Sequence, residues 1–151
     1  MHWASVSKSV TALAALQLQQ DPSANYSITD LVSKHCSYWP QSVNYRAIDG
    51  TTGTDSRHRQ VTVQNALLNR SGINHYGNGR NGDSTLVNGK FVRFANNSGY
   101  TVDDNEFNGS SSVGVFNNSV LDYAPGANYS YTTYGFNLVG ATVEEASPNG
   151  Y

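Results

Sequence analysis

Cysteine is almost absent from this 151-residue chain, and its scarcity excludes two classes of protein. A single cysteine, Cys36, cannot form an internal disulfide and cannot build a zinc site that needs several thiolates. His35 stands beside it, but adjacent residues seldom converge on one ion, and the other histidines lie far away in the sequence. We therefore interpret this pair as a partly buried thiol beside a surface imidazole and expect no metal site.

Charge and long apolar runs are also scarce. Charged residues make up 13% of the chain, the net charge is −2 and the pI is near 6.0. This balance argues against nucleic acid as a partner and against a basic membrane-binding surface. The apolar stretch 6–18 is shorter than the about 20 residues that span a bilayer. We expect no signal peptide in the sequence as written, and a periplasmic or extracellular location would require one in the full-length protein.

The N-terminal part predicts one long helix and one short one. Residues 5–20 form the long helix, which ends at Asp21-Pro22 because the residue before a proline avoids the helical region. Ser27-Ile28-Thr29-Asp30 indicates a short helical piece through Val32 or Ser33, and the polar stretch 41–59 predicts a loop. Apolar residues cover more than one stripe of the long helix, which is typical of a helix buried on most sides. They are Val6, Val10, Leu13, Ala14, Leu16 and Leu18.

The remainder of the chain predicts two further helices and a hairpin. Thr62 is a suitable N-cap for a helix over 63–69, which Ser71-Gly72 stops. Asn88-Gly89 lies between β-branched and aromatic residues and predicts a small hairpin over 86–92. The last helix runs from 131 or 132 to 146, while 76–83 and 95–112 are irregular.

Ser5 and Lys8 stand at the start of the first helix. Residues three apart share a helix face, so the hydroxyl of Ser5 and the amine of Lys8 can meet. A cation in the first helical turn opposes the helix dipole and costs about 0.3–1 kcal/mol. This placement is poor for capping and suits chemistry, although Ser5 as a plain N-cap and Lys8 as a solvated side chain are the alternatives.

Three blocks of sequence carry a family resemblance. They are ASVSKSVTALAALQL at 4–18, VTVQNALLNRSGI at 61–73 and PGANYSYTTYGFNLVG at 125–140. In this order they resemble the nucleophile helix and two later motifs of the serine β-lactamase-related family, which includes class C β-lactamases, D-alanyl-D-alanine peptidases and esterases. The resemblance spans most of 3–147 and implies an α+β fold. Here that fold is mainly its helical part, with three main helices, long loops, a small β-hairpin and most of the sheet absent, as a single partial domain over 1–151.

The resemblance also implies roles for individual residues. Ser5 matches the acylated nucleophile, Lys8 its general-base partner and Tyr131 the tyrosine of the second motif. A serine hydroxyl is a weak nucleophile that an adjacent base must activate. Thr133 stands where the family usually has an asparagine that binds substrate, which slightly favours a peptidase or esterase over a β-lactamase. The implied substrate is a small-molecule or peptide amide or ester, and no cofactor or metal is required.

One family motif does not occur in its usual place. No Lys-Thr-Gly or His-x-Gly follows Tyr131, and His75-Tyr76-Gly77 precedes the tyrosine block and is interpreted as a chance match. In the family this motif lies on a strand that supplies the second backbone N–H of the oxyanion hole, the first being that of Ser5. The loss of one such donor costs about 10²–10³ in rate. The alternative to an enzyme is therefore a non-catalytic binding or structural module, or half of a split enzyme completed by another chain or a second copy.

Overall fold

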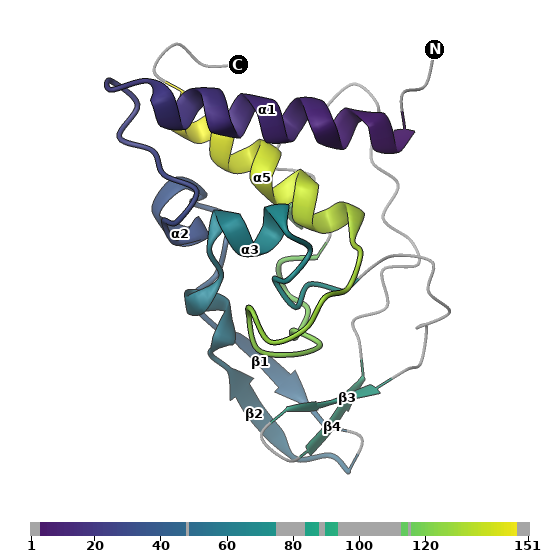
Figure 1. Cartoon of the computed structure of the whole chain (residues 1–151). Helices are drawn as coiled ribbons and strands as arrows, with labels where there is room; N and C mark the ends of the chain where they lie inside the picture. The colour runs from purple at the N-terminus through teal and green to yellow at the C-terminus, as the bar shows by residue number, and fades with distance from the viewer. Residues whose placement is uncertain are drawn as a thin grey trace.

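Helix α5, Thr133–Ala146, is the element on which the other helices pack. The computed structural model describes residues 4–47, 49–74, 84–87, 90–93, 113–114 and 116–147. Figure 1 shows α1, Ser7–Gln20, lying across one side of α5, with α2, Val32–His35, and α3, Val63–Leu67, on its other side. Short 3₁₀ turns, Ala4–Val6 and Arg57–Gln60, precede α1 and α3.

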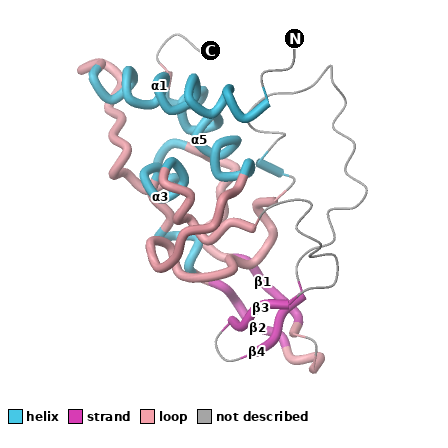
Figure 2. Tube along the Cα trace, turned by 45° about the vertical axis from the view of Figure 1, so that its right-hand side comes forward, coloured by secondary structure: helices cyan, strands magenta, loops and turns pink. Residues whose placement is uncertain are grey.

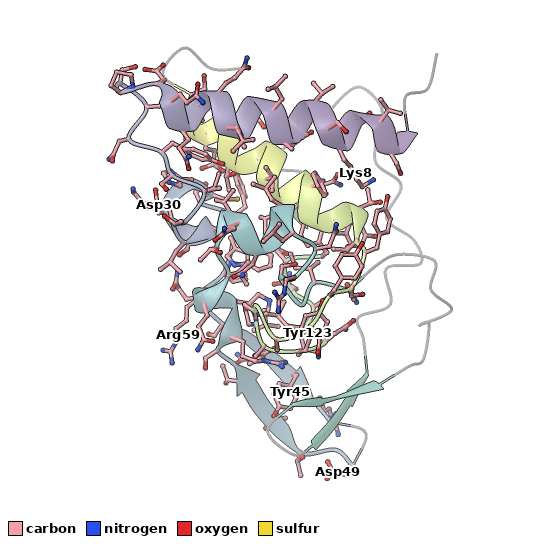
Figure 3. All side chains as sticks on the ribbon, viewed as in Figure 1. Lys8, Asp30, Tyr45, Asp49, Arg59 and Tyr123 are labelled. Carbon is pink, nitrogen blue, oxygen red and sulfur yellow. The ribbon has the colours of Figure 1, made fainter. Side chains whose placement is uncertain are left out.

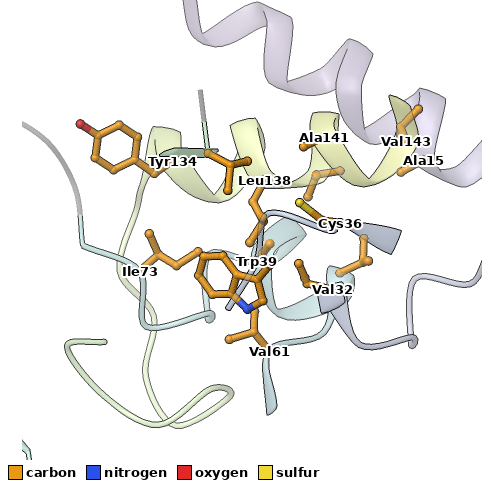
Figure 4. Close-up of a cluster of buried hydrophobic side chains, with 14 of the residues drawn as sticks. Ala15, Val32, Cys36, Trp39, Val61, Ile73, Tyr134, Leu138, Ala141 and Val143 are labelled. Atoms are coloured by element: carbon orange, nitrogen blue, oxygen red, sulfur yellow. The ribbon is translucent and has the colours of Figure 1, made fainter. Parts of the chain in front are cut away.

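The core lies along the buried face of α5. Tyr134, Leu138 and Ala141 follow one another at spacings of four and three, and all three are buried. Figure 4 shows Leu138 above Trp39, which other core residues surround. Burial of one such leucine contributes about 1.5–3 kcal/mol. The helix predicted from 131 or 132 to 146 is confirmed, although it begins later, at Thr133.

Helix α3 begins at the N-cap that the sequence indicates. The Thr62 Oγ1 accepts a hydrogen bond from the Asn65 amide at 3.1 Å, and the Asn65 Oδ1 accepts one from the Thr62 amide at 3.1 Å. This reciprocal pair is a capping box, and it satisfies two backbone donors that a helix leaves unpaired. The predicted helix is confirmed, although it ends at Leu67, two residues before the predicted end.

The burial predicted for the first helix is wrong. Ala15 is the only residue buried among the described residues of α1, and Val10 and Leu13 are 53% and 55% exposed. The helix packs on α5 along one side, and its other side faces outward, as Figure 1 shows. Apolar residues on several faces therefore do not require a neighbour on each face.

The short helix lies later than predicted. Ser27 and Asp30 form a turn instead of a first helical turn: the Asp30 amide donates to the Ser27 carbonyl, and the Ser27 amide donates to the Asp30 Oδ2, both at 3.0 Å. The Val32 amide then donates to the Val61 carbonyl at 2.9 Å. This tertiary hydrogen bond fixes the backbone at Val32, which is where α2, Val32–His35, begins.

The loop predicted over 41–59 is also wrong, because it contains a hairpin. Strand β1, Val43–Arg46, pairs antiparallel with β2, Thr52–Asp55. Gly50 in their connection has φ +85°, which a glycine adopts without strain, and the Asp49 carboxylate accepts a hydrogen bond from the Thr51 amide at 3.0 Å. Asp-Gly is a hairpin-turn signal of the same kind as Asn-Gly.

The hairpin predicted around Asn88-Gly89 is confirmed. Strand β3, Ser84–Val87, pairs antiparallel with β4, Lys90–Arg93, and Val87 stands opposite Lys90. The two connecting residues, and the irregular stretches predicted at 76–83 and 95–112, lie outside the described residues. Figure 2 shows both hairpins at the end of the molecule away from α1, so helices and antiparallel strands are segregated, as an α+β class requires.

Candidate active site

Ser5 lies in the 3₁₀ turn Ala4–Val6 that leads into α1. The N-cap position of α1 is Val6, and no side chain caps the helix there. The Ser5 hydroxyl instead lies 2.8 Å from the Tyr131 hydroxyl, a contact between residues 126 positions apart. The exposed serine therefore does not act as an N-cap, and its hydrogen bond joins the two ends of the chain.

Lys8 contacts the same hydroxyl. Its Nζ donates a hydrogen bond to the Ser5 Oγ at 3.3 Å, so the amine and the hydroxyl meet as the i, i+3 spacing predicts. The Nζ also lies 5.2 Å from the centre of the Tyr131 ring and 6.0 Å from that of Phe136. Figure 3 shows Lys8 on the side of α1 that faces α5. Two aromatic rings therefore hold the amine by cation–π attraction beside the serine.

Tyr131 lies two residues before α5, next to the N-cap residue Thr132, and is 40% exposed. Hydrogen bonds from Lys8 and Ser5 hold the pKa of its phenol below the usual value, and Thr133 acts in the same direction. Each of these contacts favours the phenolate because it supplies a donor or a positive charge. Thr133, the first residue of α5, thus lies at the same site, and all four residues predicted from the sequence come together.

Phe136 was not predicted at this site. It lies on the first turn of α5, five residues after Tyr131, where its ring meets the Lys8 amine. No spacing in the sequence connects it to Tyr131, because the two lie five positions apart and Tyr131 lies outside the helix. Only the packing of α1 on α5 brings the lysine to it.

Among the described residues, no group of three or more His, Cys, Asp or Glu side chains is arranged so that it could hold a metal ion. The prediction that His35 lies at the surface is wrong, because its side chain is buried. Its Nε2 lies 2.8 Å from the Asp30 Oδ2, and its ring packs on Tyr26. Cys36 is buried as well, and burial raises the pKa of its thiol to about 11.

Helices able to cross a membrane are not found within the described ranges, since none combines the necessary length with the necessary hydropathy. The longest described helices, α1 and α5, have 14 residues each. At 1.5 Å per residue each is about 21 Å long.

A serine hydroxyl is activated as a nucleophile by an adjacent base, and the Ser5 hydroxyl contacts both an amine and a phenol. The family model described as Beta-lactamase matches residues 1–151, and the chain belongs to that family. Membership indicates activity of the serine hydrolase type. A comparison with curated proteins found no match.

Proposed function

We propose that the chain is a serine hydrolase that cleaves an amide or ester through an acyl-enzyme, with Ser5 as the nucleophile. The observation that supports this proposal is the contact of the Ser5 Oγ with both the Tyr131 hydroxyl, at 2.8 Å, and the Lys8 Nζ, at 3.3 Å. The phenol lies within the about 2.6–3.2 Å reach of a general base, and the amine lies just beyond it, which is common at sites without bound substrate.

The proton of Ser5 has two acceptors in this arrangement. When Lys8 donates to the Ser5 Oγ, the serine hydroxyl is left to donate to Tyr131, whose lowered pKa favours the accepting phenolate. Lys8, the general base that the family resemblance implies, is the second acceptor that we propose, because its Nζ is the other group in contact with the Ser5 Oγ. In both cases the two groups share the proton, as the general-base role of Lys8 and the relay role of Tyr131 require.

The reaction then balances in two steps. The Ser5 Oγ forms a bond to the carbonyl carbon, the bond to the leaving group breaks, and the leaving amine or alcohol takes the proton from Tyr131 or Lys8. A water molecule next attacks the acyl carbon and gives a proton to the same pair. The bond between the acyl carbon and the Ser5 Oγ breaks, and the pair returns the proton to the Oγ as the acid is released. No step uses a metal or an organic cofactor.

Thr133 is the residue we propose to contact substrate. It lies at the N-terminal end of α5, half-buried, and interacts with Tyr131. Its hydroxyl provides one donor and its oxygen accepts, whereas an asparagine amide would provide two donors and a carbonyl. We infer from this smaller set of hydrogen bonds that a peptide or ester is a better substrate than a β-lactam.

Covalent labelling tests the proposal. A fluorophosphonate forms an Oγ–phosphorus bond with an activated serine and releases fluoride, so the intact mass rises by the probe less hydrogen fluoride. A labelled penicillin tests acylation in the same way. We expect the wild-type protein and the Ser9→Ala control, which removes an exposed serine one helical turn away, to be labelled, and the Ser5→Ala variant to stay unmodified. Unchanged mass of folded wild-type protein would contradict the enzymatic proposal.

A second candidate function is a non-catalytic module, or one half of a site that another chain or a second copy completes. The observation that favours it is exposure: the site is open to water, and Val6, Val10 and Leu13 lie exposed along α1 next to Ser5. Preorganised dipoles stabilise a transition state best where water is excluded. Labelling that depends on protein concentration would support completion by a second copy, and folded protein that is never labelled would support the module.

A further inference from the structure

We propose that Asn69 is a positioning residue, which holds Tyr131 against Ser5 by binding the backbone on both sides of the tyrosine. The catalytic consequence rests on the proposed function, whereas the positioning itself does not. The Asn69 carbonyl oxygen accepts a hydrogen bond from the Ser130 amide at 2.9 Å. Its side-chain Oδ1 accepts one from the Thr132 amide at 3.1 Å. One residue thus fixes both neighbours of Tyr131.

Asn69 reaches this segment because of how α3 ends. The Asn69 amide donates to the Ala66 carbonyl at 3.1 Å, and the Arg70 amide donates to the Asn65 carbonyl at 2.7 Å. Together with the φ of +54° at Asn69, these two bonds form a Schellman motif, in which a left-handed residue closes the helix. The turn directs the two oxygens of Asn69 away from α3 and toward the segment before α5.

Glycine is the usual residue at this left-handed position, and asparagine is a less frequent choice. A glycine would close α3 with less strain and would keep the carbonyl that binds Ser130. It would lack the side-chain oxygen that binds the Thr132 amide. The Thr132 amide is one of the donors that the start of α5 leaves unpaired, so the asparagine provides a bond that glycine cannot.

Two further hydrogen bonds hold the segment around Tyr131, one at Gly126 and one at Thr132 itself. The Gly126 amide donates to the Arg70 carbonyl at 2.7 Å, and the buried Thr132 Oγ1 donates to the Asn74 carbonyl at 2.9 Å. Residues 69–74 therefore form a template, the segment whose oxygens accept hydrogen bonds from the chain between 126 and 132. Asn69 is the member of this template that binds directly beside the tyrosine, on either side.

The Tyr131 side chain is 40% exposed and is not part of the buried core cluster, so the backbone on either side of it helps to determine where its phenol lies. A shift of about 1 Å in a positioned group can cost about 10² in rate. A backbone held on both sides keeps the phenol within 2.8 Å of the Ser5 hydroxyl. The bond from Thr132 to the side chain is the one that a substitution can remove without changing the backbone.

The test compares three variants of the full chain. Asn69→Gly keeps the left-handed backbone and removes the Oδ1, and Asn69→Asp restores an oxygen that can accept. Asn25→Gly is the matched control, because Asn25 is the other described non-glycine residue at positive φ, +45°, and lies exposed beyond the opposite end of α1. It introduces the same change of residue type away from the site.

The first measurement is the titration of the Tyr131 phenol. It is monitored by carbon NMR of protein labelled at tyrosine Cζ, in which the Tyr131→Phe variant identifies the Tyr131 signal. We expect the Asn69→Gly variant to move the pKa of Tyr131 toward the usual value, because the contacts with Lys8 and Ser5 that lower it are loosened. We expect Asn69→Asp to recover part of the shift and Asn25→Gly to leave it in place. An unmoved Tyr131 titration in folded Asn69→Gly protein would overturn the proposal.

The second measurement is the rate of fluorophosphonate labelling. We expect a loss of about tenfold in Asn69→Gly, the order of one hydrogen bond, with partial recovery in Asn69→Asp. Slower labelling with an unchanged Tyr131 titration would mean that Asn69 acts by another route and would overturn the positioning role. A moved titration in a protein whose wild type is never labelled would support the positioning role and contradict the proposed function alone.

Discussion

Replacing Tyr131 by phenylalanine removes one oxygen from the site and little else. The ring that lies 5.2 Å from the Lys8 Nζ is kept, and so is the hydrogen bond from Lys8 to the Ser5 Oγ at 3.3 Å. What disappears is the 2.8 Å contact between the phenol and the serine hydroxyl, together with the hydrogen bonds of the phenol oxygen to Lys8 and Thr133. The substitution therefore isolates the role of Tyr131 in proton transfer.

The size of the effect follows from what the oxygen does. A positioned acid–base group contributes about 10²–10⁴ in rate, which corresponds to about 2.7–5.4 kcal/mol of barrier at 1.36 kcal/mol per factor of ten. Tyr131 is exposed, so the free energy of unfolding should change by no more than about 0.5 kcal/mol. A large loss of reactivity with an unchanged melting temperature is the expected result.

The assay measures the second-order rate constant for fluorophosphonate labelling at a series of pH values. The extent of labelling is read from the intact mass of the protein. In the wild type the rate should rise with pH through a pKa below the usual tyrosine value, because the phenolate is the accepting form. That rise should vanish in Tyr131→Phe. The matched control is Tyr129→Phe, at a tyrosine that is 69% exposed. A Tyr131→Phe rate indistinguishable from that of the control would refute the reasoning.

Two further predictions concern stability, each measured by urea unfolding. Asp55 is 1% exposed and accepts hydrogen bonds from the Arg57 side chain and the Leu121 amide, so Asp55→Ala should cost about 3–5 kcal/mol, because it removes the carboxylate partner of Arg57 and leaves the buried Leu121 amide without its acceptor. Burial raises the pKa of Asp55, but the Arg57 hydrogen bonds outweigh it and hold the pKa below its usual value. The cost should therefore be full above about pH 4, the unfolded value, and shrink as pH falls through the folded one; a cost that grows in acid would contradict this assignment. Gly72→Ala should destabilise the chain by at least about 1 kcal/mol, because Gly72 has φ +82° and an added Cβ would overlap the Tyr123 carbonyl oxygen. An unchanged urea midpoint would contradict this prediction, because it would show that the backbone at Gly72 and at Tyr123 can move apart to admit the methyl group.

Local signals in the sequence predict α3, α5 and the second hairpin, because their cause is local. A threonine cap, a helical spacing of buried residues and an Asn-Gly pair act within a few residues. The hairpin β1–β2 has the same kind of signal in Asp49-Gly50, which the polar composition of the stretch conceals. The exposure of α1 and the burial of His35 could not be predicted in this way, because both depend on which distant element packs against them.

The site divides along the same line. The i, i+3 spacing is enough to bring Lys8 to Ser5, since both belong to one helical turn. Tyr131 lies 126 positions from Ser5, and no periodicity or composition joins them; only a family resemblance selects that tyrosine from its neighbours. Asn69 and Phe136 carry no motif signal of this kind, because their contacts arise from the packing of α3 and α1 around the start of α5.

The most direct test of the account is to find which atom a serine-directed probe modifies. The folded wild-type protein is treated with fluorophosphonate and digested with trypsin, which releases the peptide Met1–Lys8 with two serines, Ser5 and Ser7. Fragment masses separate the two positions. The account predicts the adduct on Ser5. An adduct on Ser7 or elsewhere, or none in protein shown to be folded, would contradict it.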